Sequence, residues 1–410
     1  RWEIQEGKVK LVRKDRNGNS LLHKKMLAIF GWRENRRAMI EVLPVRTARE
    51  RKRFLNFAAE IYRDIPAWVP PLQMDVLSQI DPDKGDFFKH STGEFFMAWR
   101  EGKPLGRIAA LHNTRHIDAH ADGAGFFGFF ECEDNPTTAK ALLDTAEKWL
   151  REQGLAVARG PANFSVQDEA GVLIDGFEHT PMSGMGYTPP YYRGLLEAAG
   201  YTKAKDLYVF RITRETWKSD QFDRMCAVAD RVAAGVTLRS LNMKDLPAEA
   251  ARMELIFAEA WRDNWGAQPI SQAEFLKYAH DFRLFINPEL IVFAERDDEP
   301  LGMVVAIPNM NKIIQRIGGR MLPFGWWTLL TQRKRVTGVR LFLMGLRKSA
   351  RRLGLPILLI RAIHNVLIKY QHPGELEFSW ILEDNHETIA LIKRVGGYQV
   401  QTLRIYDKTL

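Results

Sequence analysis

The sequence predicts an α/β protein in which one domain, a mixed central sheet with flanking helices, occurs twice in tandem. One shared pattern reads REGKPLGRIAA in residues 100–110 and RDDEPLGMVVA in residues 296–306, at an offset of 196. Another reads LLEAAGY in residues 195–201 and IKRVGGY in residues 392–398, at an offset of 197. Two nearly equal offsets favour a duplicated unit over the alternative, a chance similarity between common hairpin and helix-end patterns.

The chain of 410 residues is long enough for two domains of ordinary size. In each domain we expect a strand and a helix, then a β-hairpin, a parallel strand, a crossover helix, a further strand and helix, and a closing strand. The predicted segments are a basic N-terminal segment (1–39), an N-terminal domain (40–214), a linker (215–235) and a C-terminal domain (236–410).

Cysteine content and hydropathy exclude several classes of protein. Two cysteines, Cys132 and Cys226, are too few for a disulfide framework and argue against a structural zinc site. No apolar run approaches the roughly 20 residues of a membrane span, and we recognise no signal peptide. We therefore expect a cytoplasmic protein that is soluble or peripheral on the inner face of the cytoplasmic membrane.

The net charge of +9 is unevenly distributed along the chain. Residues 1–39 contain 11 Lys and Arg against 4 Asp and Glu, and the stretch between Glu299 and Glu375 contains 13 Lys and Arg and no acid. Such a field attracts a polyanion: the phosphates of a cofactor, a nucleic acid or an anionic membrane surface. The alternative interpretation is a solvated basic face.

A phosphate-binding unit is predicted in the second domain. The apolar strand 341–346 is followed by a basic turn, residues 347–354, and then by a long apolar helix over residues 357–370. Free backbone N–H groups and the helix dipole at such a helix N-terminus favour a phosphate. Gly354 allows close approach of the backbone, and Pro356 suits the first helical turn.

This run resembles the pyrophosphate loop of the GNAT superfamily of acyl-CoA-dependent N-acyltransferases, which reads Arg/Gln-x-x-Gly-x-Gly/Ala. Residues 351–356, RRLGLP, keep the first basic residue and the first Gly but end in Pro. Asn385 follows the next strand, where GNAT proteins have an Asn that caps a helix and faces the coenzyme. The resemblance implies acyl-CoA as co-substrate, no metal, and these coenzyme-binding residues: Leu346, Arg347, Arg351, Arg352, Gly354, Leu355 and Asn385.

The first domain lacks this loop. After its central strand comes ECEDNP, residues 131–136, whose three acids would repel a pyrophosphate. We therefore expect one coenzyme, in the second domain, with the first domain completing a shared site.

Further motifs resemble one bacterial family of double-GNAT proteins that includes the bacterial ceramide synthases. They lie in residues 125–135, 160–165, 168–169, 175–177, 188–192, 263–266 and 379–385. The resemblance implies a tandem GNAT fold and transfer of a long acyl chain from CoA to the amine of a sphingoid base. The alternatives are a GNAT enzyme acting on a soluble amine or a cell-wall precursor, and a binding module without catalysis. Nucleic acid is not an expected partner, because the basic stretches lack the interleaved aromatic residues of a recognised nucleic-acid fold.

Residues 316–335 form an insertion that a compact acetyltransferase does not need. They combine large apolar side chains and a Trp pair with flanking Arg and Lys. Trp at the headgroup level and cations against anionic lipid are typical of an interfacial segment. We expect contact with a membrane or an acyl chain here, against the alternative of a short amphipathic helix packed on the protein.

Amide formation from a thioester requires a base for the amine and polarisation of the carbonyl group. In GNAT folds a bulge exposes a backbone N–H group to that carbonyl, and we expect it at residues 304–306. The candidate catalytic residues are Glu383, Asp384, Asp168 and His116. The candidate substrate-binding residues are Asn163, Tyr191, Asp263, Asn264 and Trp265. The alternative roles are helix capping and surface charge for the acids and a structural role for His116.

Overall fold

The computed structural model describes residues 2–5, 8–11, 39–281, 287–332, 336, 338–370 and 374–410. Most of the predicted basic N-terminal segment lies outside the described residues. Its described part is a two-stranded hairpin of β1 (Trp2–Gln5) and β2 (Lys8–Leu11).

The N-terminal half of the chain has the predicted order of elements. They are β3 (Glu41–Pro44), α2 (Ala48–Ile61), α3 (Gln73–Gln79), η1 (Asp86–Lys89), β4 (Thr92–Arg100), β5 (Lys103–His112), α4 (Thr114–His120), β6 (Ala124–Cys132), α5 (Pro136–Glu152), β7 (Val157–Gly160), β8 (Val172–Asp175), α6 (Tyr192–Ala198) and β9 (Thr202–Ile212).

The predicted linker contains a helix, α7 (Ser219–Val232), and the C-terminal half then repeats the order. Its elements are β10 (Thr237–Ser240), α8 (Leu246–Ala260), α9 (Gln272–Asp281), η2 (Pro288–Leu290), β11 (Ile291–Arg296), β12 (Glu299–Pro308), α10 (Asn311–Arg316), α11 (Gly325–Gln332), β13 (Gly338–Leu346), η4 (Lys348–Ala350), α12 (Leu355–Lys369), β14 (Glu375–Leu382), α13 (His386–Arg394) and β15 (Tyr398–Thr409).

The two predicted hairpins have the same turn. Glu101 and Gly102 join β4 to β5 with φ of 50° and 76°, and Asp297 and Asp298 join β11 to β12 with φ of 50° and 62°. Positive φ at both central residues matches the right-handed twist of the flanking strands. The similarity between residues 100–110 and 296–306 therefore reflects a repeated hairpin.

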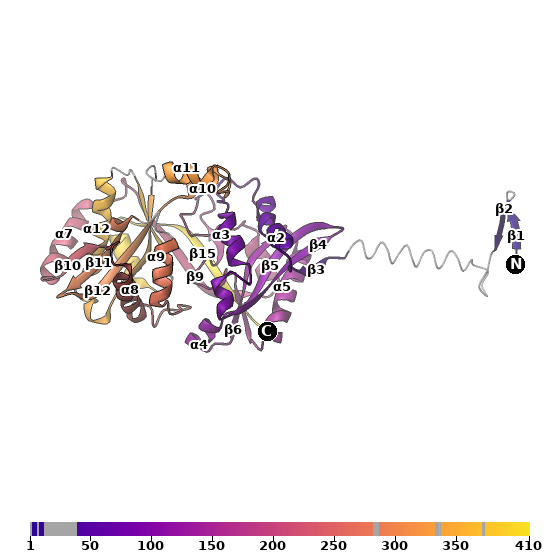
Figure 1. Cartoon of the computed structure of the whole chain (residues 1–410), viewed down its shortest axis with the longest axis horizontal. Helices are drawn as coiled ribbons and strands as arrows, with labels where there is room; N and C mark the ends of the chain where they lie inside the picture. The colour runs from indigo at the N-terminus through magenta and orange to yellow at the C-terminus, as the bar shows by residue number, and fades with distance from the viewer. Residues whose placement is uncertain are drawn as a thin grey trace.

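Both halves contribute to one continuous sheet of 13 strands (Figure 1). Its order is β10-β11-β12-β13-β14-β9-β15-β7-β6-β5-β4-β3, with β8 paired to β15. The closing strands are exchanged: β9 from the N-terminal half pairs with β14, and β15 from the C-terminal half pairs with β7. A boundary drawn in the sequence between residues 214 and 236 thus does not separate the strands of the sheet.

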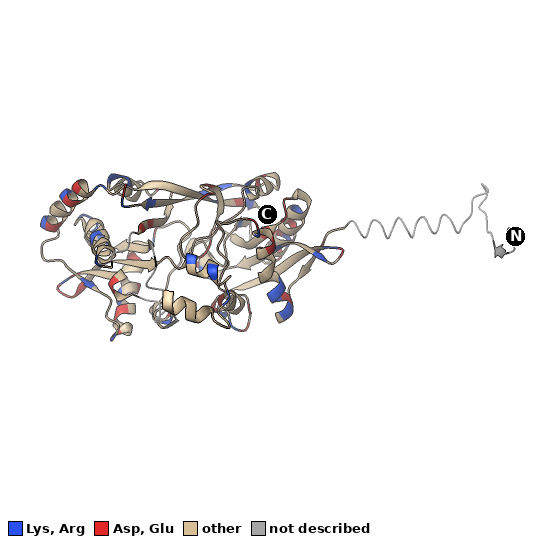
Figure 2. Cartoon of the chain, turned by 90° about the horizontal axis from the view of Figure 1, so that it is seen from above, with Lys and Arg blue, Asp and Glu red and all other residues tan. Residues whose placement is uncertain are grey.

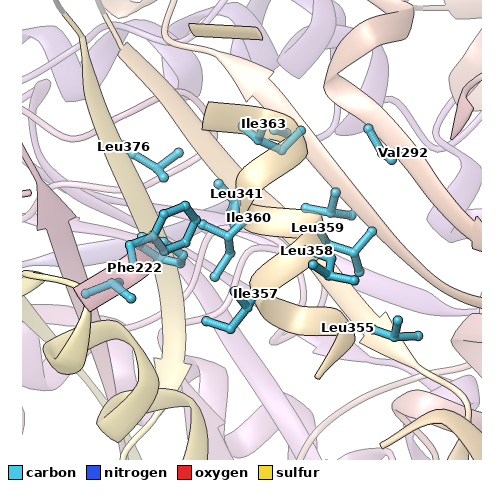
Figure 3. Close-up of a cluster of buried hydrophobic side chains, with 14 of the residues drawn as sticks. Phe222, Val292, Leu341, Leu355, Ile357, Leu358, Leu359, Ile360, Ile363 and Leu376 are labelled. Atoms are coloured by element: carbon cyan, nitrogen blue, oxygen red, sulfur yellow. The ribbon is translucent and has the colours of Figure 1, made fainter. Parts of the chain in front are cut away.

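Helices cover both faces of the C-terminal part of the sheet. On one face α7, α12 and α13 pack on a core that includes Phe222, Ile360 and Ile392 (Figure 3). On the other face α8 and α9 pack on a core that includes Phe257 and Phe293. The coenzyme loop predicted after β13 therefore lies at one end of a two-faced, well-buried sheet.

The N-terminal part has the same arrangement, with α5 and α6 on one face. On the other face, α2 packs on a core to which β9, β14 and β15 also contribute, through Val209, Leu382 and Leu403. This core is shared between the two halves of the chain. Among the described residues, no helix is both long enough and apolar enough to cross a bilayer.

The exchanged strands predict that the two halves lose stability together. Leu403 of β15 is 1% exposed in the shared core, so that Leu403→Ala is expected to lower the free energy of unfolding by about 2–5 kcal/mol. Hydrogen exchange should accelerate in β7 and in β14 alike. Tyr398→Ala is the control. Tyr398 begins the same strand and is 41% exposed, so this substitution should have little effect. Faster exchange confined to the C-terminal half would contradict a shared core.

Candidate active site

The strands β13 and β14 are paired at one end and part at the other. Their parallel register runs from Gly338 opposite Glu375 to Leu341 opposite Phe378, although β13 continues to Leu346 and β14 to Leu382. Beyond Leu341 and Phe378, the backbone groups of β13 do not pair with those of β14. A parting of two central parallel strands gives an extended ligand access to backbone N–H and C=O groups.

A β-bulge lies where the strands part. Val305 of β12 faces Leu343 and Ala306 faces Leu341, so that Phe342 of β13 is the extra residue. The register shift thus occurs within the expected residues 304–306, but the bulged residue belongs to the neighbouring strand. The Phe342 residue is 41% exposed. A bulge of this kind re-aims the backbone next to a site.

In the N-terminal half, a side chain of the protein itself bonds to the backbone of the equivalent bulge. Phe129 of β6 has φ of 48°, and its backbone N–H donates to the Asn163 side-chain oxygen at 2.6 Å. The segment after β7 also packs directly on β6, because a Cβ atom on Gly128 would lie 2.2 Å from the Ala162 carbonyl oxygen. The side chain of Asn163, predicted to bind substrate, is therefore engaged by the bulge of its own half.

The two crossover helices, α5 and α12, also differ in whether a side chain caps the N-terminus. Asn135 caps α5, where its side chain accepts from the N–H groups of Thr137 and Thr138. In α12 the N-cap is Gly354, with φ of 69° and no side-chain cap. The first-turn N–H groups of α12 therefore have no side-chain acceptor at the cap, as a helix that binds a phosphate requires.

Gly354 is needed at this position for two reasons. A positive φ is strained for other residues, and a Cβ atom would lie 3.0 Å from the Cβ atom of Ala229 on α7. Leu355 begins α12 and is fully buried, and Leu346 ends β13 against the same core. These two predicted coenzyme-binding residues shape the loop through packing.

The basic residues of the loop separate into two groups. Arg347 is held away from the helix N-terminus by Glu259 at 2.8 Å and Glu299 at 2.5 Å. Arg351 and Arg352 are exposed, and within the described part of the chain neither forms an ion pair. Arg351 and Arg352, rather than Arg347, are therefore free to bind an anion.

A groove of about 560 Å³ adjoins this loop, and we call it the α7 groove. It is lined by Gln221, Arg224, Met225, Val228, Ala229, Val232, Arg352, Gly354, Ile357 and Arg394. Arg352 and Gly354 were predicted from the sequence. Arg224 and Arg394 were not, because the linker helix and the end of α13 lie far from the loop motif along the chain.

Asn385 is the N-cap of α13, with its side chain accepting from the Thr388 N–H group at 3.3 Å. This confirms its predicted capping role and places it directly after β14. Its predicted contact with the coenzyme stays a prediction.

A buried polar network lies beneath the parting strands. Arg340 of β13 is 2% exposed and donates to the hydroxyl of Ser379 at 2.8 Å and to the Ser183 carbonyl at 2.9 Å. Ser379 in turn donates to Glu377 at 2.7 Å, and Arg211 of β9 pairs with Glu377 at 2.9 Å. Burial lowers the pKa of Arg340 to about 10, so that Arg340 remains charged at neutral pH.

Asp168 lies in the N-terminal half, on the segment that closes its bulge. Burial among protein atoms raises the pKa of Asp168 to about 6, although the Ser165 hydroxyl donates to it at 2.6 Å. The residue nevertheless remains exposed to solvent. The charge of Asp168 also affects Tyr278 of α9. Burial is the larger cause and Asp168 the next largest cause that raises the pKa of Tyr278 to about 12. Asp168 therefore lies close enough to α9 of the C-terminal half to influence the pKa of Tyr278.

The candidate acids after β14 are ion-paired. Glu383 accepts from Lys203 at 2.6 Å, and Asp384 accepts from Lys205 at 2.9 Å. The hydrogen bond from Lys205 holds the pKa of Asp384 below its usual value. Neither pair includes Asp168, so the structure does not gather the predicted acids into one cluster.

His116 is fully buried on α4, where its Nε2 atom lies 3.1 Å from Asp122. Burial lowers its pKa to about 4. Asp122 also pairs with Arg159 at 2.6 Å. A side chain without solvent access cannot reach a substrate in this arrangement, and the geometry fits the structural alternative. Among the described residues, no group of three or more His, Cys, Asp or Glu side chains could hold a metal ion.

The predicted substrate-binding residues lie in three places. Trp265 packs in the shared core between Arg159 and Lys205, whose cations lie 5.0 and 5.8 Å from its ring. Asp263 pairs with Lys348 of η4 at 3.6 Å, and Asn264 lies next to it in the same loop. Tyr191 lies on the other side of the sheet, where its hydroxyl donates to the Cys132 carbonyl at 2.8 Å. The structure therefore brings Trp265, but not Tyr191, to the interface between the halves.

The predicted interfacial segment forms α10 and α11. Seen from above, α10 carries basic side chains and α11 carries no charge (Figure 2). Large exposed apolar side chains gather here: Leu322 (68%), Phe324 (74%), Trp326 (44%) and Trp327 (59%). Leu329 is buried instead, in a small core with Ile313. Residues 333–335, the basic end of the predicted segment, lie outside the described residues.

Comparisons with known proteins are consistent across sequence and structure. The chain is 35% identical over 388 residues to "Bacterial ceramide synthase" of Caulobacter vibrioides (strain NA1000 / CB15N), which covers 91% of this chain and 98% of that protein. It is 31% identical over 366 residues to "Protein YghO" of Escherichia coli (strain K12), covering 88% of this chain and 93% of that protein. No protein-family model matches the chain.

Among solved structures, a tandem GNAT protein from the clavulanic acid biosynthesis pathway covers 90% of this chain and 98% of its own, with a TM-score of 0.53 and 13% identity. This likeness confirms the predicted tandem GNAT fold. Together with the identity to the Caulobacter protein over nearly the whole chain, it means that this protein belongs to the family of tandem GNAT N-acyltransferases that includes that bacterial ceramide synthase.

Proposed function

We propose that this N-acyltransferase moves a long acyl chain from acyl-CoA to the amine of a sphingoid base. The observation that carries the proposal is the near full-length similarity to a protein named bacterial ceramide synthase. The geometry supports it at three points: the coenzyme side, the acceptor side and the exposed apolar surface.

On the coenzyme side, the donor would bind with its phosphates at the N-terminus of α12 and its thioester between β13 and β14. The uncapped N-terminus at Gly354 suits a pyrophosphate, as do Arg351 and Arg352, which form no ion pair among the residues that the structure describes. The bulge at Phe342 would direct a backbone N–H to the thioester carbonyl. Amine attack on that carbon forms the C–N bond, breaks the C–S bond and releases CoA.

On the acceptor side, Asp168 is the favoured general base. A base must be unprotonated at neutral pH, yet basic enough to accept a proton, and a pKa of about 6 meets both conditions. Glu383 and Asp384 are held by Lys203 and Lys205, which makes them weaker candidates. A carboxylate would also attract the cationic amine before its deprotonation.

The exposed apolar surface of α11 supports a lipid acceptor. Phe324, Trp326 and Trp327 are the residue types that enter the interfacial region of a bilayer, and Lys312 and Arg316 on α10 suit anionic headgroups. A sphingoid base is a membrane lipid, so an enzyme acting on it needs such a surface. A soluble amine would not require one.

The reaction itself is tested by mass spectrometry of the purified chain with palmitoyl-CoA or acetyl-CoA and a panel of amines. Sphinganine and 3-ketosphinganine represent the lipid acceptors, and glucosamine represents a soluble acceptor. We expect an amide from palmitoyl-CoA and a sphingoid base. Transfer to glucosamine with no lipid amide would reject the proposed acceptor while retaining the N-acyltransferase.

Asp168 predicts a characteristic pH dependence. Because its pKa is raised to about 6, Asp168 is protonated below that pH, and kcat/KM should fall as the pH falls through 6. Asp168→Asn should lower kcat/KM by about 10²–10⁴-fold at neutral pH and remove this limb of the profile. Glu383→Gln is the comparison and should keep it. A wild-type profile in Asp168→Asn would exclude Asp168 as the base.

The apolar surface predicts membrane binding that depends on its aromatic residues. Phe324→Asp with Trp327→Asp should weaken flotation with phosphatidylglycerol vesicles more than about tenfold, because each buried aromatic side chain contributes about 1.5–3 kcal/mol. Leu43→Asp, at a 49% exposed position on the distant edge strand β3, should float as the wild type does. Equal flotation of all three proteins would argue against an interfacial role for α11.

A further inference from the structure

The α7 groove is built partly by a helix that belongs to neither repeat. Helix α7 packs antiparallel to α12, because Phe222 near its start contacts His364 of α12 and Ala229 near its end contacts Gly354. The adjoining stripe of α7, through Gln221, Met225, Val228 and Val232, lines the groove. The linker therefore forms one wall of a space that begins at the N-terminus of α12.

Three arginines line this groove without a carboxylate partner. Arg224 of α7, Arg352 of the loop after β13 and Arg394 of α13 are all exposed, and none forms an ion pair with another described residue. A neighbouring arginine differs: Arg361 of α12 is paired with Asp230 of α7 at 2.6 Å. Three unpaired guanidinium groups around one space repel each other, and an anion bound there would relieve that repulsion.

The groove also has an apolar wall. Val228 and Val232 are 51% and 48% exposed and lie one helical turn apart, and Ile357 lies in the same lining. The occupant should therefore combine negative charge with a flat apolar part. A nucleotide with phosphates on two sides of its base and sugar has this chemistry.

We propose that the α7 groove binds the nucleotide end of the coenzyme, with Arg224 and Arg394 on its 3′-phosphate and the adenine against Val228 and Val232. This inference rests on the proposed acyl-CoA donor. If Arg352 and the N-terminus of α12 bind the pyrophosphate, the nucleoside must extend from there. Arg224 precedes Ala229, the residue against Gly354, by five positions, or about 7.5 Å along the helix axis.

The consequence is that the linker helix selects the 3′-phosphate. Isothermal titration of the full chain with CoA and with 3′-dephospho-CoA separates this contact from the rest of coenzyme binding. The wild type should bind CoA about 10–100-fold more tightly than 3′-dephospho-CoA, as expected for charge-assisted hydrogen bonds to one phosphate. Arg224→Gln with Arg394→Gln should bind both ligands equally, with unchanged affinity for 3′-dephospho-CoA.

Arg231→Gln, on α7 but outside the groove, is the matched control and should keep the preference for CoA. Equal binding of the two ligands by the wild type, or a preference retained in the double variant, would overturn the inference but leave the acyl-CoA donor in place. Failure of the folded wild type to bind either ligand would instead refute the donor itself, and this inference with it.

Discussion

The pairing of β9 with β15 is the constraint on which the rest of the structure depends. The two strands run side by side from Tyr398 opposite Arg211 to Asp407 opposite Thr202. The other N-terminal strands lie on the far side of β15, and the other C-terminal strands lie on the far side of β9. Because β9 borders β14 and β15 borders β7, neither half can complete its sheet alone. The exchange also fixes how loops of the N-terminal half reach the parted strands of the C-terminal half.

The two halves of the chain differ at equivalent positions beside the central strands. In the N-terminal half the Asn163 side chain occupies the bulge amide of Phe129 and Asn135 caps α5. In the C-terminal half the equivalent positions are Phe342 and Gly354, which lack these internal acceptors. The closing segment then continues to Asp168, the base of the proposed reaction, which accepts from the Ser165 hydroxyl at 2.6 Å.

Local patterns predicted what depends on local sequence. The hairpins, the helix N-terminus at Gly354 and the cap at Asn385 each follow from a few consecutive residues, and the structure has them all. Contacts between distant segments were not predictable in this way. The exchanged strands, the groove arginines Arg224 and Arg394, and the capture of Arg347 by Glu259 depend on tertiary packing. The sequence left a catalytic and a structural role open for His116, because the contacts with Phe126 and Asp122 that enclose it also depend on the fold.

Charge explains why the proposed chemistry needs both halves. Arg340 donates to neutral oxygens of Ser183 and Ser379, and its nearest carboxylate, Glu377, accepts from Ser379 and also pairs with Arg211. A buried positive charge near the parted strands stabilises a developing oxyanion or thiolate. It also repels a cationic amine. In the proposed reaction, an acceptor amine would therefore be held and deprotonated by a carboxylate on the other side of the site, and the proposed base, Asp168, belongs to the N-terminal half.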